Sequence, residues 1–394
     1  MSQTLPALLI QEEKMKSWIK KKIISIIKPC ILFESSPDFS DNSRAVYDEM
    51  VRRGYDKKYD LIWFVDWDKC ATIKKDGSID YWDPSDNKTL GKRIRCYAFY
   101  HKCRAIICCS RFIPSRGYVK GNHIRSFYLS HGTPMKSVKQ YYTSPGRVNY
   151  ILSPSEAMNS VMAYEFSFKP EQVFAAGFPR NDVFARPPVD LKSILGTECS
   201  KIIAWYPTYR QHFSNGIVTS SISIPIVHDE QAAFRLNEIA AENGVLLLLK
   251  PHPAQDVSLL QKLDLSNIWM INDRFLTQKG LLSYEMLRGT DALITDYSSV
   301  YFDYTLCDKP IGVVWEDIDE YRQFPGFALD LDKYLKGAEK IYTVEDFGRF
   351  IKEVADGTDT LREERREIRD LTNISTDGQN TSRVVDFIAE KAAL

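Results

Sequence analysis

The chain lacks any C-x-x-C pair, although it contains eight cysteines in 394 residues. Most of the cysteines lie within apolar runs such as residues 105–109. A chain of this length can bury a core without covalent cross-links, so we interpret the cysteines as buried free thiols in a reducing cytoplasm. This spacing argues against a disulfide framework and against a zinc site.

Long apolar runs are also absent. No run approaches the roughly 20 residues needed to span a bilayer, and residues 5–10 are too short and lack a preceding basic flank for a secretory signal. We therefore expect the protein to stay inside the cell.

Net charge is absent as well, because 52 basic residues balance 52 acidic ones. This balance argues against a basic protein that binds nucleic acid.

Three common nucleotide and metal motifs are missing. The sequence contains no G-x-G-x-x-G, no G-x-x-x-x-G-K-[ST] and no H-E-x-x-H, so dinucleotide oxidoreductase, P-loop NTPase and zincin functions lose their main support. D-x-D triplets occur at Asp66/Asp68, Asp317/Asp319 and Asp330/Asp332, but a chain with this many acids produces them by chance. We predict no cofactor and no metal site.

Residues 14–28 form a basic amphipathic segment, KMKSWIKKKIISIIK, with six lysines and no acid. Its apolar residues recur every three or four positions, which places them on one face of a helix. This pattern is typical of a helix lying on an anionic membrane surface, where each lysine contributes about 1 kcal/mol. The alternative is a domain helix whose apolar face packs on the core.

Beyond Pro29, short apolar runs alternate with amphipathic stretches, which indicates parallel α/β architecture. We predict two doubly wound sheets, one in each of two domains at 30–190 and 191–394, preceded by the segment 1–29. The paired prolines Pro187 and Pro188 mark residues 185–196 as the linker. The predicted strands are residues 31–34, 61–65, 105–109, 126–129, 150–152, 173–176, 202–205, 245–250, 268–271, 292–295 and 311–315.

Polar clusters follow several of these strands, and the carboxyl ends of strands are where such folds bind ligands. ALITDYSSVYF, residues 292–302, predicts a strand, a polar turn and a helix, so that Ser298 and Ser299 can donate to phosphate oxygens. An ordinary helix cap is the alternative. In LKPHP, residues 249–253, two prolines hold His252 beside Lys250, a pair that suits a diphosphate.

In LSHGTPMK, residues 129–136, His131 is a candidate general base and Gly132 permits close backbone approach. A structural histidine in a turn is the alternative. GFPRND, residues 177–182, and YPTYR, residues 206–210, place Arg180 and Arg210 just past strands. The arginine fork suits phosphate, although either arginine could instead form an interdomain salt bridge.

Taken together, these segments resemble the CDP-glycerol glycerophosphotransferase family, which builds teichoic acid backbones and some bacterial capsules. The resemblance runs from about residue 30 to the end and also includes SPSEAM at 153–158 and DGQNTSRV at 377–384. Two departures leave the chemistry intact: Ser130 replaces an aromatic residue, and GFPRND replaces GYPRND.

The resemblance implies a GT-B fold, with two Rossmann-like domains facing across a cleft and the nucleotide held mainly by the second. It implies that His131 is the base and that His252 is the second catalytic residue, which contacts the donor's diphosphate. The candidate substrate-binding residues are Gly132, Thr133, Arg180, Asn181, Asp182, Pro207, Thr208, Arg210, Lys250, Asp296, Tyr297, Ser298, Ser299 and Asp303.

The implied partners are CDP-glycerol, a saccharide acceptor linked to undecaprenyl diphosphate, and an anionic membrane surface, with a homo-oligomer left open. A peripheral enzyme on the cytoplasmic face of the membrane is expected. Similarity in size to the short members that add a first unit favours priming. Three alternatives stay open: a CDP-ribitol ribitolphosphotransferase, a GT-B sugar-nucleotide glycosyltransferase, and a non-catalytic nucleotide-binding partner of other wall enzymes.

Overall fold

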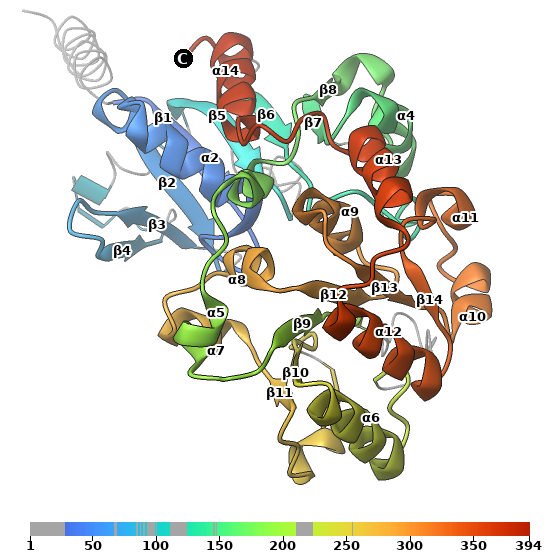
Figure 1. Cartoon of the computed structure of the whole chain (residues 1–394). Helices are drawn as coiled ribbons and strands as arrows, with labels where there is room; N and C mark the ends of the chain where they lie inside the picture. Colours follow the sequence, from blue (N-terminus) through green and yellow to red (C-terminus); the bar gives the residue numbers. More distant parts are fainter. Residues whose placement is uncertain are drawn as a thin grey trace, which may run out of the picture. The chain divides into compact units, whose positions relative to one another are not determined.

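The computed structural model (Figure 1) describes residues 28–66, 69–83, 86, 88–89, 91–92, 99, 101–110, 124–144, 146, 148–209, 224–253 and 255–394. The chain folds into two compact units. The first contains residues up to 129, together with 146–149 and 385–394, and the second contains 130–145 and 150–384. The basic segment predicted at 14–28 lies outside the described residues except for Lys28. No helix in the described ranges is both long enough and apolar enough to cross a bilayer.

In the first unit, a mixed sheet has the order β4-β3-β2-β1-β5-β6. Strands β2, β1, β5 and β6 are parallel, and β3 and β4 extend the sheet as an antiparallel hairpin. Helix α2 (Asp41–Arg52) packs through Tyr47 on Phe33 of β1, with ring centroids 5.3 Å apart. The strands are β1 (Cys30–Glu34), β2 (Asp60–Val65), β3 (Lys69–Ile73), β4 (Ile79–Trp82), β5 (Cys103–Cys108) and β6 (Arg125–Tyr128).

The second unit contains a fully parallel sheet in the order β11-β10-β9-β12-β13-β14. Numbered along the chain, this order is 3-2-1-4-5-6, the Rossmann arrangement, whose direction reverses between the first and fourth strands. These strands are β9 (Lys201–Trp205), β10 (Val245–Leu249), β11 (Ile268–Met270), β12 (Ala292–Thr295), β13 (Ile311–Val314) and β14 (Glu339–Ile341). The same unit also holds the parallel pair β7 (Tyr150–Ser153) and β8 (Val173–Ala175).

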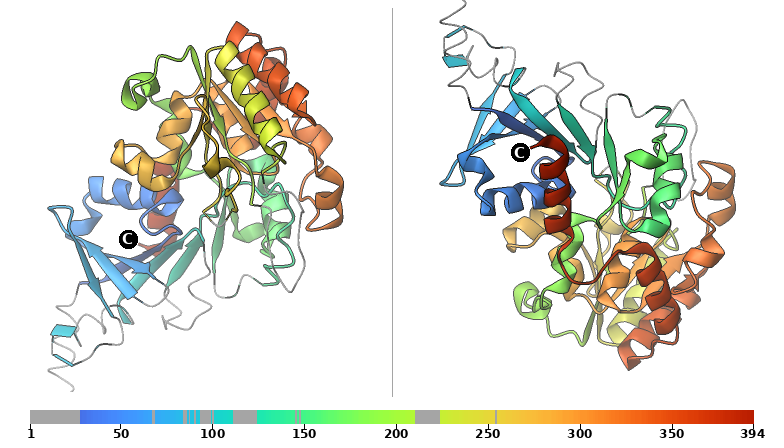
Figure 2. Two further views of the ribbon diagram at one scale, coloured as in Figure 1. Left: turned by 90° about the horizontal axis from the view of Figure 1, so that it is seen from below. Right: turned by 90° about the horizontal axis from the view of Figure 1, so that it is seen from above.

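Successive side chains along the strands of this sheet point to opposite faces, as in any β-strand, and pack into different hydrophobic clusters. Leu247 and Leu249 face α6 and α12, which lie side by side on one face (Figure 2). Leu246 and Leu248 face the opposite side, packed with α5, α7 and α8. The sheet is therefore doubly wound, as its apolar runs predicted.

The helices of the second unit vary greatly in length. Its α-helices are α4 (Asn159–Glu165), α5 (Leu191–Leu195), α6 (Glu230–Glu242), α7 (Asp273–Gln278), α8 (Ser283–Gly289), α9 (Val300–Tyr304), α10 (Ile318–Gln323), α11 (Leu331–Tyr334), α12 (Val344–Asp356) and α13 (Arg362–Thr372). Helix α14 (Asn380–Ala392) begins in this unit and ends in the first. The principal 3₁₀ helix is η5 (Pro179–Ala185).

Every predicted strand is present, with ends shifted by at most two residues. The sequence analysis missed three strands, β3, β4 and β14. Pro187 and Pro188 lie in the irregular stretch between η5 and α5, inside the second unit. The thiol prediction is confirmed for the described cysteines: none is in a disulfide, five are buried, and Cys199 and Cys307 are partly buried.

Candidate functional site

The switch point of the parallel sheet lies between β9 and β12, and two of the predicted motifs follow these strands directly. The Thr208 N–H donates to both carboxylate oxygens of Asp296, at 3.0 and 2.9 Å, and the Thr208 hydroxyl also bonds this carboxylate. The Tyr206 N–H donates to the Ile294 carbonyl at 2.8 Å. Asp296 is fully buried, so its carboxylate holds the two loops together from inside the protein.

In the turn that follows β12, some side chains point into the protein and others point toward solvent. Tyr297 is 1% exposed, and its hydroxyl donates to Asp317 at 3.1 Å. Ser298 and Ser299 are partly exposed. The two serines, rather than Tyr297 and Asp296, are therefore the members of this motif that a ligand can reach.

The loop that carries His131 lies against the same turn. His131 is exposed, whereas Gly132 is buried with φ +135°. A Cβ atom added to Gly132 would lie 2.7 Å from the Ser299 Oγ and 2.9 Å from an Arg180 terminal nitrogen. Glycine is required here both by the positive φ and by this close approach. The structure therefore brings together residues from the LSHGTPMK, DYSS and GFPRND segments.

Arg180 reaches this place from η5 and is held there by a buried network. Its guanidinium donates to Asp303 at 2.7 Å and lies 4.7 Å from the Tyr284 ring centroid. Asp303, 1% exposed, also accepts hydrogen bonds from the Asn181 amide at 2.7 Å and the Tyr284 hydroxyl at 2.6 Å. Asp303 and Asn181 thus orient Arg180 from within the protein.

Asp182, the last residue of GFPRND, caps helix α14. Its carboxylate accepts from the backbone N–H groups of Asn380 and Thr381, both at 2.8 Å. Burial is the main influence on this carboxyl group and raises its pKa above the ordinary value. The C-terminal motif DGQNTSRV is therefore joined to GFPRND by side-chain and backbone contacts.

The LKPHP segment begins where β10 ends. The Lys250 ammonium lies 3.1 Å from an Asp273 carboxylate oxygen, and its side chain is 16% exposed. The imidazole of His252 is open to solvent but packs on the Tyr209 ring, with centroids 4.7 Å apart. Partial loss of solvent, then the positive charges of Lys250 and Lys136, lower the pKa of His252 below its ordinary value of 6.5. The imidazole is therefore mainly neutral at pH 7.

The remaining predicted residues have different environments. Pro207 and Thr208 are partly buried in the loop after β9. Thr133 is 1% exposed, and its hydroxyl has no hydrogen-bond partner among the residues that the structure describes. Arg210 lies outside the described residues.

The sequence analysis did not select Tyr209, Tyr284 or Lys136 as site residues. Tyr209 and Lys136 stand inside motifs that were already recognised, YPTYR and LSHGTPMK, and this membership was the usable signal. Tyr284 has no such signal, because it comes from α8 and reaches Arg180 only through the fold.

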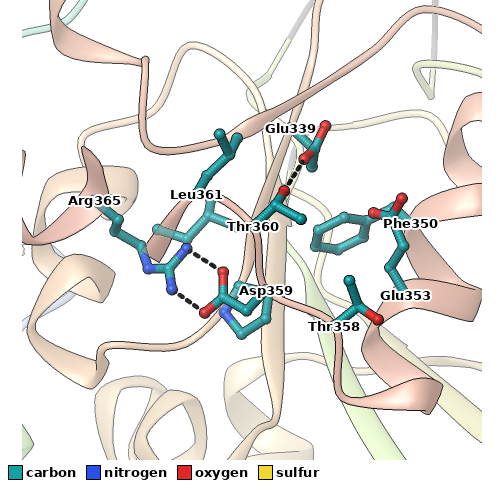
Figure 3. Close-up of a pocket in the computed structure, with 10 residues that line it drawn as sticks. Glu339, Phe350, Glu353, Thr358, Asp359, Thr360, Leu361 and Arg365 are labelled. Atoms are coloured by element: carbon teal, nitrogen blue, oxygen red, sulfur yellow. Dashed lines mark hydrogen bonds and ion pairs between the residues drawn. The ribbon is translucent and has the colours of Figure 1, made fainter. Parts of the chain in front are cut away.

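A separate pocket lies at the opposite edge of the sheet, where β13 and β14 begin (Figure 3). Its polar side chains bond mainly to one another: Arg365 donates to Asp359 at 3.0 Å, and the Thr360 hydroxyl to Glu339 at 3.4 Å. None of the predicted site residues lines it.

The model of the CDP-glycerol:poly(glycerophosphate) glycerophosphotransferase family matches residues 19–390. The chain belongs to this family.

The chain is similar to proteins named for glycerol phosphate and to proteins named for ribitol phosphate. The teichoic acid glycerol-phosphate primase of Bacillus subtilis is 28% identical over 52% of this chain and 47% of its own length. The ribitol-phosphate polymerase TarK of Staphylococcus aureus is 25% identical over 82% of this chain and 63% of its own length. The chain thus spans about half to two thirds of these relatives.

Among solved structures, the wall teichoic acid polymerase TagF aligns with 100% of this chain and 99% of the compared chain, at a TM-score of 0.66 and 19% identity. TagF soaked with CDPG aligns with a TM-score of 0.65. At this identity the likeness shows a common α/β, GT-B-like fold.

Proposed function

We propose that this protein transfers glycerol phosphate from CDP-glycerol to a hydroxyl group of a lipid-linked acceptor in the synthesis of teichoic acid or a related capsule polymer. The observation that carries the proposal is the grouping of Arg180 and Ser299 around Gly132, since both lie within 3 Å of the place that a Cβ atom on Gly132 would occupy. Family membership and the CDPG-soaked TagF structure support the choice of donor.

The proposed reaction is an in-line displacement at phosphorus. The acceptor oxygen forms a bond to the glycerol-bearing phosphorus, while the bond from that phosphorus to the bridging oxygen breaks and CMP leaves. His131 takes the proton of the attacking hydroxyl, a contribution that is typically worth about 100-fold to 10,000-fold. Charge on the transferring group is met by hydrogen-bond donors and cations that are positioned before the reaction.

His252, Lys250, Ser298, Ser299 and Arg180 supply those donors in our proposal. His252, neutral near pH 7, would donate one hydrogen bond to the diphosphate, and the two serines would donate from the turn after β12. The buried hydroxyl of Thr133 is a further donor on the loop of His131. Asp182, Asp296, Tyr297 and Asp303 would support this set from inside the protein, as their contacts indicate.

The test is CMP release by the full chain with CDP-glycerol and a lipid-linked saccharide acceptor. We expect acceptor-dependent release in the wild type and a loss of at least 100-fold in His131→Ala at saturating concentrations of both substrates. Full turnover in this variant would refute the base assignment. Absence of CMP release from the wild type with every polyol donor would refute the proposed reaction and favour a non-catalytic nucleotide-binding role.

A specific observation favours one second candidate. The similarity to a ribitol-phosphate polymerase makes CDP-ribitol an alternative donor. Competition between the two donors in one assay would decide, because a faster transfer of ribitol phosphate would replace the glycerol assignment while leaving the mechanism in place.

The acceptor, the membrane and the domain roles complete the proposal. The acceptor would be a saccharide on undecaprenyl diphosphate, and a single addition to a short acceptor, measured by mass spectrometry, would indicate priming. Residues 30–190 would bind the acceptor and residues 191–394 the donor. Residues 14–28 would dock on the cytoplasmic membrane face, so vesicle binding should require anionic lipid and weaken with salt.

A further inference from the structure

The segment after Gly132 is fixed by backbone contacts on both sides of Lys136. The Ala328 N–H donates to the Met135 carbonyl and the Ser137 N–H to the Gly326 carbonyl, each at 2.9 Å, which makes an isolated antiparallel bridge opposite Phe327. The position of the Lys136 backbone is therefore well defined.

One buried carboxylate secures the next turn of the same segment. Glu165 of α4 is 2% exposed and accepts from the backbone N–H groups of Val138 and Lys139, at 2.7 and 3.0 Å, and from the Ser137 hydroxyl at 3.0 Å. The backbone of this loop is therefore held in place on both sides of the turn.

The Lys136 side chain is directed toward two other parts of the site. Its ammonium lies 5.8 Å from the Tyr321 ring centroid, and that ring packs on Tyr297, which immediately precedes the serine pair, with centroids 4.4 Å apart. Its charge is also close enough to His252 to lower the pKa of that imidazole. Lys136 is partly buried between these neighbours.

Two cations of the described part of the site are each held by a carboxylate. Lys250 is paired with Asp273 at 3.1 Å and Arg180 with Asp303 at 2.7 Å. A nucleoside diphosphate ester carries two negative charges, and a third cation at the same place would help to balance them.

We propose that Lys136 binds the diphosphate of the nucleotide donor, together with Lys250 and His252. The inference rests on the proposed function and deepens it. Because Lys136 and His131 belong to one short loop, binding of the diphosphate by Lys136 would also fix the loop that carries the base. The same loop would thus position both Lys136, which contacts the donor, and His131, which takes the proton of the acceptor hydroxyl.

The test compares Lys136→Met, which keeps the apolar stem, with Lys139→Gln as the matched control. Lys139 stands three residues later, and its ammonium bonds the Ser167 hydroxyl at 2.8 Å. Calorimetric titration of the full chain with CDP and with cytidine gives the readout. We expect Lys136→Met to weaken CDP binding about 10-fold to 100-fold, as for a lost charge-assisted hydrogen bond, and to leave cytidine binding unchanged.

Lys136→Arg should recover most of the CDP affinity, and Lys139→Gln should bind both ligands like the wild type. Lys136→Met should also raise the pKa of His252, followed by NMR, because a positive charge that opposes its protonation has been removed. A merely structural role would weaken CDP and cytidine equally.

The outcomes separate this inference from the proposed function. If the wild type binds and turns over CDP-glycerol but Lys136→Met binds CDP with unchanged affinity, only the role of Lys136 is overturned. Failure of the wild type to bind CDP and CDP-glycerol would overturn both. Should Lys136→Met fail to fold, Lys136→Gln provides the same charge removal, with its folding checked by circular dichroism.

Discussion

Replacing Gly132 by alanine should reduce both activity and stability. The new methyl group would lie 2.7 Å from the Ser299 Oγ, and 2.9 Å from both the Ser299 Cβ and an Arg180 terminal nitrogen. The serine Cβ is fixed to the backbone, and the arginine is held by Asp303, so neither neighbour can move away alone. The substitution must therefore shift the loop, the turn or both.

The magnitude follows from two contributions. A non-glycine residue at φ +135° is strained by about 1–3 kcal/mol. Crowding in a packed environment adds about 1–3 kcal/mol. We expect Gly132→Ala to lower the free energy of unfolding by about 2–6 kcal/mol and turnover by at least about 100-fold, because a displacement near 1 Å is enough for such a loss.

Gly357 offers a matched control for the backbone contribution. It has φ +76° at the C-terminus of α12, and nothing lies within 4 Å of an added Cβ. Gly357→Ala should cost about 1 kcal/mol and leave turnover unchanged. Urea unfolding and CMP release measure the two quantities. Equal turnover in both variants would refute the close packing of the His131 loop on Ser299.

Three further predictions concern the pH dependence, the Arg180 network and the cap of α14. CDP-glycerol should raise the pKa of His252, observed by NMR, because its bound diphosphate ester, a dianion throughout this pH range, stabilises the imidazolium; CDP-glycerol affinity should therefore increase as pH falls from 7.5 to 6, and a pH-independent affinity would argue against contact. Tyr284→Phe keeps the ring beneath Arg180 but removes a hydrogen bond to Asp303, so kcat/KM should fall about 10-fold with unchanged secondary structure; an unchanged kcat/KM would remove Tyr284 from the positioning network. Asp182→Ala should lower the free energy of unfolding by about 1–2 kcal/mol in urea, since two backbone donors of α14 lose their acceptor, and a smaller loss would show that water replaces the cap.

Several of the strands that the sequence predicted correctly share one property. Runs such as 245–249 and 292–295 are buried on both faces, so each is a continuous apolar stretch. Strands β3, β4 and β14 lack this signal. β4 is an edge strand with exposed residues, and β14 has three residues of which two are only partly buried. Gly77 in the turn between β3 and β4 was the available clue to that hairpin.

The motifs did not distinguish the residues that are open to solvent from those that are buried. Ser298 and Ser299 are accessible, whereas Tyr297 and Asp303 in the same segment point inward. Sequence spacing in a turn of irregular geometry does not fix side-chain direction. Partners from distant elements, such as Tyr284 on α8, become visible only when the chain is folded.

The most direct test of the central claim follows the phosphorus atom. CDP-glycerol carrying ³²P in the glycerol-bearing phosphate and tritium in the glycerol would be incubated with the full chain and a lipid-linked acceptor. The proposed reaction predicts that both labels move to the acceptor in equal amounts and that unlabelled CMP is released. Retention of ³²P in a released nucleoside diphosphate, with tritium alone on the acceptor, would contradict phosphoglycerol transfer.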